Sequence, residues 1–82
     1  MDFDFPFYTM QGDGDVFVKH VARDKCIVVN SFIYSPSIRV VNWSGLTTSR
    51  EYDRAANNEA QPIPKARFDL ERQQVINQLI HG

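Results

Sequence analysis

The stretch from residue 16 to residue 34, VFVKHVARDKCIVVNSFIY, constrains the fold of this chain more than any other. β-branched and aromatic residues dominate it, and such side chains favour the pleated surface of a β-sheet. The only polar break is Arg23-Asp24-Lys25, so the stretch predicts two antiparallel strands joined by a tight turn. With Asp24 and Lys25 at the centre of that turn, Phe17 lies opposite Phe32.

Two further strands flank this hairpin. Residues 2–10 alternate phenylalanine with polar residues, and Pro6 places that strand at a sheet edge because proline cannot donate a ladder hydrogen bond. The Asp13-Gly14 turn then pairs Thr9 with Val18 and Phe7 with His20. Residues 38–43 form a fourth strand, with Ile38 opposite Ile33, so the sheet is a four-stranded antiparallel meander.

The predicted pairing divides the side chains between two faces. One is mainly apolar and nearly uncharged, and we name it the predicted core face; it carries Phe3, Phe5, Phe7, Val16, Val18, His20, Ala22, Ile27, Val29, Ser31, Ile33, Ile38 and Val40. The other combines rings with bases, and we name it the predicted mixed face; it carries Tyr8, Met10, Phe17, Lys19, Val21, Arg23, Cys26, Val28, Asn30, Phe32, Tyr34, Arg39, Val41 and Trp43.

Two helices follow the strands. Thr48 and Glu51 have capping-box spacing, which predicts a short helix over residues 49–57. Asp69 is a suitable N-cap for a last helix over residues 70–81, whose apolar stripe should cover the predicted core face against Phe5, Val18, Val29 and Val40. The fold class expected for residues 1–82 is therefore α+β: a single domain with a four-stranded antiparallel β-meander, a C-terminal helix packed on one face, and a short additional helix.

Composition limits the classes of function. The net charge of −1 gives no overall attraction to nucleic acid, and no apolar run is long enough to cross a membrane. Cys26 is the only cysteine, so an internal disulfide cannot form and a reducing compartment is expected. With no signal peptide visible, we expect a cytoplasmic protein without membrane partners.

Three catalytic or metal-binding interpretations are weak. Cys26 and His20 could form a nucleophile and base, but the predicted register places them on opposite faces. Residues 12–15, GDGD, resemble the start of a calcium loop, yet Phe17 and Val21 occupy later ligand positions. Paired carboxylates in a cleft, phosphate loops and metal-spaced histidines are also absent from the sequence. We therefore expect no enzyme, no metal and no cofactor.

The predicted mixed face is the remaining candidate, because a solvated sheet face does not need so many large rings. Residues 46–64 could cover it. It could instead bind a protein partner or form a homodimer, since Tyr, Trp, Phe and Arg are enriched at interfaces. It could also stack single-stranded nucleic acid, with the lysine and arginines at the phosphates. The candidate binding residues are Tyr8, Phe17, Lys19, Arg23, Phe32, Tyr34, Arg39 and Trp43.

The expected function is a non-catalytic protein–protein interaction module. Its small size is compatible with an adaptor or an inhibitor of a larger protein, such as short phage or plasmid products. The alternative is a single-stranded nucleic-acid-binding protein that uses the same face.

Overall fold

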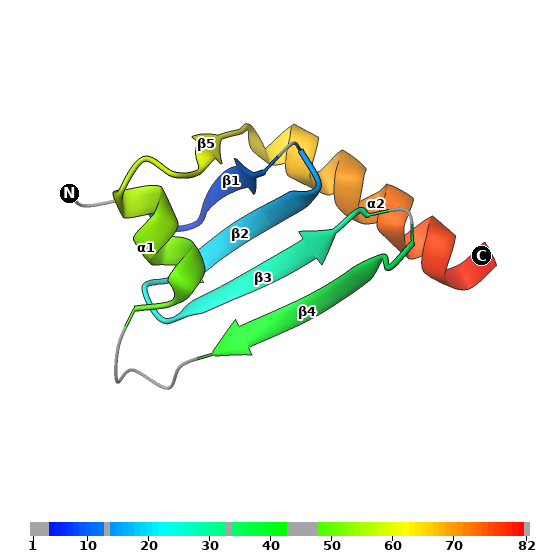
Figure 1. The fold of residues 1–82 in the computed structure, drawn as a ribbon, viewed down its shortest axis with the longest axis horizontal. Helices are drawn as coiled ribbons and strands as arrows, with labels where there is room; N and C mark the ends of the chain where they lie inside the picture. Colours follow the sequence, from blue (N-terminus) through cyan, green and yellow to red (C-terminus); the bar gives the residue numbers. More distant parts are fainter. Residues whose placement is uncertain (1–3, 13, 33, 43–47, 82) are drawn as a thin grey trace.

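The computed structural model describes residues 4–12, 14–32, 34–42 and 48–81 of the chain. A five-stranded antiparallel sheet runs through these ranges, with a helix on each face (Figure 1). The elements are β1 (Phe7–Gln11), β2 (Val16–Ala22), β3 (Lys25–Asn30), β4 (Ser37–Asn42), α1 (Arg50–Ala56), β5 (Gln61–Pro62) and α2 (Lys65–His81). The sheet order is β4-β3-β2-β1-β5, so the predicted α+β class, meander and two helices are confirmed.

The register of the first hairpin is confirmed. Phe7 pairs with His20 and Thr9 with Val18, as the Asp13-Gly14 turn predicts. In the connection, Gly12 has a φ of 63° and Gly14 a φ of 92°, values in the left-handed region that glycine adopts without a steric penalty.

The predicted register of the second hairpin is wrong. Phe17 lies opposite Val29 rather than Phe32, and the pairs from Val16 to His20 are all shifted by the same three positions. Ala22, which lies opposite Lys25, is shifted by two. Part of the shift arises because the turn is centred on Arg23-Asp24, one residue earlier than expected. The rest comes from a bulge between His20 and Ala22, which inserts an extra residue into β2.

A shift of three positions is odd, so it exchanges the faces of one hairpin relative to the other. The α2 face carries Tyr8, Met10, Phe17, Lys19, Ile27, Val29, Ile38 and Val40. The α1 face carries Phe7, Thr9, Gln11, Val16, Val18, His20, Cys26, Val28, Arg39 and Val41. Each real face thus combines predicted core residues with predicted mixed ones. Ile38 pairs with Val29 instead of Ile33, but that shift of four is even and keeps the two strands in phase.

β1 is not the sheet edge, contrary to the expectation from Pro6. The two-residue strand β5 pairs with it through Thr9 and Pro62, and the Ile63 amide donates to the Tyr8 carbonyl at 3.0 Å. Pro6 lies just before β1, so its missing donor does not interrupt the ladder.

The main apolar core lies between α2 and the sheet. It is formed by Tyr8, Phe17, Val29, Phe68 and Val75. The expected contact of the last helix with Phe5 and Val18 is wrong, because Val18 points to the α1 face and Phe5 stacks on Tyr52 of α1 with ring centroids 6.2 Å apart.

α2 begins five residues earlier than predicted, immediately after Pro64. The Pro64 carbonyl accepts hydrogen bonds from the amides of Arg67 and Phe68 at 3.1 and 3.3 Å. Proline is compatible with a helix start because it has no amide that needs an intrahelical partner there. Asp69 is therefore inside the helix, where it pairs with Lys65 at 2.7 Å.

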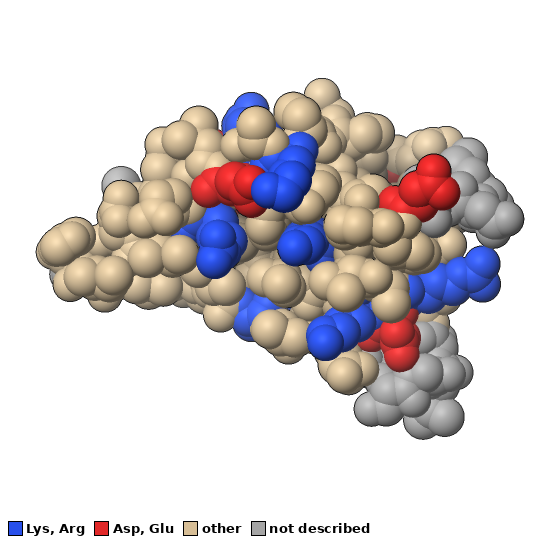
Figure 2. Space-filling view, turned by 180° about the vertical axis from the view of Figure 1, so that it is seen from behind, with Lys and Arg blue, Asp and Glu red and all other residues tan. Residues whose placement is uncertain are grey.

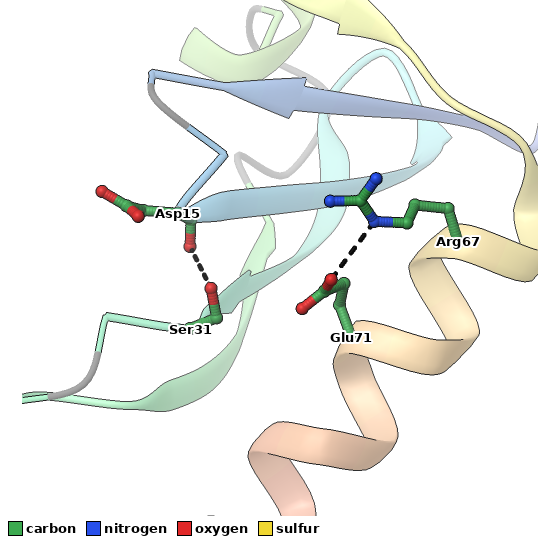
Figure 3. A network of polar contacts seen from close by, with 4 residues as sticks. All are labelled: Asp15, Ser31, Arg67 and Glu71. Atoms are coloured by element: carbon green, nitrogen blue, oxygen red, sulfur yellow. Dashed lines mark hydrogen bonds and ion pairs between the residues drawn. The ribbon is translucent and has the colours of Figure 1, made fainter.

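Arg67 extends from α2 toward β2 (Figure 3). Its guanidinium lies 5.4 Å from the centroid of the Phe17 ring and pairs with Glu71 at 3.2 Å. At the adjacent sheet end, Ser31 donates to the Asp15 carbonyl through its amide at 2.8 Å and its hydroxyl at 3.1 Å. Arg67 thus covers the Phe17 ring of the apolar core.

α1 covers one end of the opposite face. Ser49, not Thr48, is its N-cap: the Ser49 hydroxyl accepts from the Tyr52 amide at 3.0 Å. Tyr52 and Ala55 are the buried residues of the helix, and the Tyr52 ring lies 6.5 Å from that of Phe7. The remainder of the α1 face lies beyond this short helix.

Candidate functional site

The candidate residues do not form one binding face. Tyr8 and Phe17 are buried beneath α2, with 9% and 0% of their surface exposed. Lys19 is on the same α2 face, whereas Arg39 is exposed on the α1 face. Two of the predicted rings are therefore structural.

The other predicted residues are at the ends of the strands. Arg23 lies in the turn between β2 and β3. Phe32 and Tyr34 lie in the connection between β3 and β4, and Trp43 is outside the described residues. Phe32 and Tyr34 remain next to one another as predicted, with their ring centroids 5.5 Å apart in an edge-to-face arrangement. Tyr8 and Lys19 also remain cross-strand neighbours, but on the α2 face.

Lys19 belongs to a small basic depression on the α2 face. Lys65, Arg72 and Asp69 line it with Lys19, and its volume is about 280 Å³. Figure 2, which looks onto this face, shows Lys and Arg side chains spread over its middle beside a carboxylate group. Tyr8 and Phe17, two of the rings that were expected to stack bases, are buried beneath α2, so they do not combine with these bases in an accessible site.

Exposed apolar side chains gather at the end of the molecule where α2 terminates. Tyr34 is 86% exposed and Phe32 46%. On α2, Ile80 is 68% and Leu79 53% exposed, and the last turns of this helix project past the β3–β4 connection (Figure 1). We name these four residues, Phe32, Tyr34, Leu79 and Ile80, the apolar end.

The overhang follows from dimensions. A 17-residue helix is about 25 Å long. Five strands spaced by about 4.8 Å span only about 19 Å. Phe68 and Val75 occupy the part of α2 that lies on the sheet, so Leu79 and Ile80 extend beyond it. From the helical spacing of the sequence we expect the stripe that covers the core to consist of Phe68, Val75, Ile76, Leu79 and Ile80. For Leu79 and Ile80 this expectation is wrong.

β4 continues the exposed surface as an edge strand. It pairs with β3 on one side, and it is the terminal strand in the sheet order of the described residues. Val40 in the middle of β4 is 62% exposed. An unpaired strand edge offers backbone donors and acceptors to another chain.

His20 and Cys26 are cross-strand partners, contrary to the prediction that they face opposite sides. Burial lowers the pKa of His20 to about 4, and its Nε2 lies 2.8 Å from the Thr9 hydroxyl. Burial and the Glu51 carboxylate raise the pKa of the Cys26 thiol to about 12, and the thiol donates to that carboxylate at 3.7 Å. Because a nucleophilic cysteine needs a lowered pKa, this pair does not provide a thiolate near neutral pH.

Within residues 4–12, 14–32, 34–42 and 48–81, no three His, Cys, Asp or Glu side chains are grouped so that they could hold a metal ion. No helix in the same ranges combines the length and apolar character needed to cross a membrane.

The comparisons with protein-family models, with curated proteins and with solved structures found no match to this chain.

Proposed function

We propose that the protein is a non-catalytic binding module that engages another protein, or a second copy of itself, through the apolar end. The observation that carries this proposal is the exposure of four large apolar side chains at one end of a small domain. Aromatic pairs such as Phe32 and Tyr34 lose little conformational entropy on binding and are frequent interface anchors.

The surroundings of the apolar end support the same function. The edge of β4 can extend a partner's sheet, and the side chains at the end of α2 can fill an apolar groove. A partner that occupied both would cover the protruding helix and the open edge together. In this proposal the protein acts in the cytoplasm as an adaptor or inhibitor of a larger protein, and a phage or plasmid origin would suit its size.

The alternative of single-stranded nucleic-acid binding has less support. Of the rings that were to serve as stacking platforms, Tyr8 and Phe17 are buried. Lys19 and Arg39, which were to meet phosphates, are on opposite faces of the sheet.

The test is a double substitution, Tyr34→Ala with Ile80→Ala, measured by size-exclusion chromatography with light scattering and by affinity capture from the native host. Both side chains are exposed, so circular dichroism should show an unchanged fold. We expect loss of the dimer, or at least about tenfold weaker binding of the captured protein.

The matched control is Leu70→Ala, which removes another exposed apolar side chain (55%) from a different part of α2. It should leave mass and binding unchanged. A doubly substituted protein that folds and retains both its mass and its partner would contradict the proposal.

A further inference from the structure

A second surface, separate from the apolar end, lies on the α1 face. The part of the sheet beyond α1 is an open groove of about 500 Å³. Its floor is apolar and consists of Val16, Val28 and Val41, one residue from each of three neighbouring strands. A ligand that fits this floor needs an aliphatic part.

Arginines from two elements surround the floor. Arg50 and Arg54 are four residues apart in α1, a spacing that places them on the same side of the helix. Arg39 comes from β4, where it pairs with Val28 of the floor. Among the residues that the structure describes, neither Arg39 nor Arg50 forms an ion pair.

The groove is positively charged in a chain that is not. Three arginines and Glu51 give its lining a net charge of +2, whereas the whole chain has a net charge of −1. The charge of the lining is therefore opposite to that of the molecule, and it favours an anionic ligand.

Gln11 provides an independent observation that points to a ligand. Its side chain lines the groove although only 7% of the residue is exposed. Its Oε1 accepts a hydrogen bond from Arg54 at 3.2 Å, and its buried Nε2 has no acceptor in the described part of the chain. Buried amide donors are nearly always paired, so this one indicates that an acceptor is supplied from outside.

We propose that this groove binds a carboxylate of a peptide, with the Gln11 amide and Arg54 at the carboxylate and an aliphatic neighbour of the peptide on the valine floor. The carboxylate could belong to an acidic side chain or to a chain terminus, since both present the same two oxygens. Arginine pairs with a carboxylate through two parallel hydrogen bonds, and Arg39 and Arg50 supply further positive charge.

The negative charge of Glu51 favours a carboxylate ligand over a phosphate. Its carboxylate accepts from the Cys26 thiol and lies in the lining of the groove. This negative charge repels a phosphate dianion about twice as strongly as a single carboxylate. The apolar floor likewise gives inorganic phosphate no contact.

The test is a titration of the ¹⁵N- and methyl-labelled full chain, followed by NMR at the Gln11 side-chain amide and the Val28 and Val41 methyl groups. Four probes separate the possibilities. N-acetyl-Val-Glu-Val amide carries a side-chain carboxylate, and N-acetyl-Val-Gln-Val acid carries a terminal one. N-acetyl-Val-Gln-Val amide is the neutral match, and inorganic phosphate is an anion without an aliphatic part.

We expect at least one carboxylate peptide to shift these resonances and to bind about tenfold or more tightly than the neutral peptide. The stronger of the two charged peptides then identifies the source of the carboxylate. Equal binding of the neutral peptide, tighter binding of phosphate than of either charged peptide, or an unmoved Gln11 amide with every probe would each overturn the proposal.

Two variants test the residues. Arg54→Gln and Gln11→Met should each weaken the charged peptide about tenfold, because each removes a hydrogen bond to the carboxylate. Arg72→Gln makes the same change of charge on the opposite face of the sheet and should leave the affinity unchanged. If Arg72→Gln and Arg54→Gln weakened the charged peptide equally, only the overall charge of the protein would determine its affinity. That result would contradict a site formed by specific residues of the groove.

Discussion

The two faces of the sheet are buried by different means. On the α2 face, a 17-residue helix packs against the strands through a cluster of apolar side chains. The α1 face is covered at one end by a 7-residue helix. All of the buried polar residues of the described chain lie on this face or at the start of that helix: Thr9, Gln11, His20 and Ser49. Among the described residues, two buried side-chain nitrogens have no hydrogen-bond partner, one on Gln11 and one on His20, and both lie on this face.

This difference in burial suggests different roles for the two faces, one in stability and one in ligand binding. An apolar cluster contributes free energy in proportion to the area it buries, and it does not depend on pH. A polar cluster contributes less, because its hydrogen bonds replace hydrogen bonds that the unfolded chain makes with water. Its contribution also changes when one of its groups titrates. We therefore expect the α2 face to determine stability and the α1 face to respond to pH and to ligands.

The largest expected effect is on the α2 face. Phe68 is 2% exposed and contacts the Tyr8 ring at a centroid distance of 5.3 Å. Phe68→Ala should lower the free energy of unfolding by about 3–5 kcal/mol, the usual cost of a large-to-small change in a core. Urea unfolding measures this, with Leu70→Ala as the exposed control that should cost much less. Similar losses for the two variants would remove the distinction between the faces.

The second effect belongs to the α1 face and depends on pH. The pKa of His20 is about 4 in the folded protein because burial disfavours its charged form, against 6.5 for an unperturbed histidine. The stability that the neutral ring contributes is complete above pH 6.5 and is lost as the pH falls toward 4. The loss should reach about 3 kcal/mol, since each pKa unit corresponds to about 1.4 kcal/mol.

Other acidic groups also titrate in this range, so the variant His20→Gln is needed to isolate the contribution of His20. Urea unfolding between pH 7 and pH 4 should show a smaller loss of stability for His20→Gln than for the parent protein. His81→Gln, which changes an exposed histidine, should retain the parent's profile. Parallel profiles for the parent and His20→Gln would show that His20 is not held in its neutral form.

A third prediction concerns the way α1 is held on its face. Ser49 is fully buried, accepts from the Tyr52 amide, and donates its own amide to the Arg23 carbonyl at 2.8 Å. Ser49→Ala removes the capping oxygen and should cost about 1 kcal/mol. Thr48→Ala, which changes the residue that capping-box spacing favours, should cost less. The reverse order in thermal unfolding would restore Thr48 as the cap.

The sequence was sufficient for the class of the fold and for the register of β1 with β2, whereas the predicted register of β3 with β4 was wrong by four positions. Alternation of apolar residues and the Asp13-Gly14 turn correctly paired β1 with β2. It was insufficient for the central hairpin, because Arg23, Asp24 and Lys25 can form the turn in more than one way and a bulge has no clear sequence pattern. Because of this one error, the residues of each predicted face are divided between the two real faces of the sheet.

The candidate sites were harder to predict than the fold for the same reason. Arg39 was named as a binding residue, but its neighbours in the groove, Arg50 and Arg54, come from a helix whose position depends on the register. Their spacing of four residues was the only sequence signal that they share a surface. Gln11 had no signal at all, because a glutamine becomes informative only when its surroundings leave its amide unpaired.

The smallest expected effect on stability tests the function of the α1 face most directly. Gln11→Met removes a buried amide that has no acceptor and replaces it with an apolar side chain of similar length. Arg54, which loses its hydrogen-bond partner, is exposed and can bind water instead. The free energy of unfolding should therefore stay within about 1 kcal/mol of the parent value, whereas Thr9→Val, which leaves His20 without its partner, should cost about 1–3 kcal/mol. If urea unfolding shows that Gln11→Met costs as much as Thr9→Val, the Gln11 amide has a structural partner and the α1 face holds no side chain reserved for a ligand.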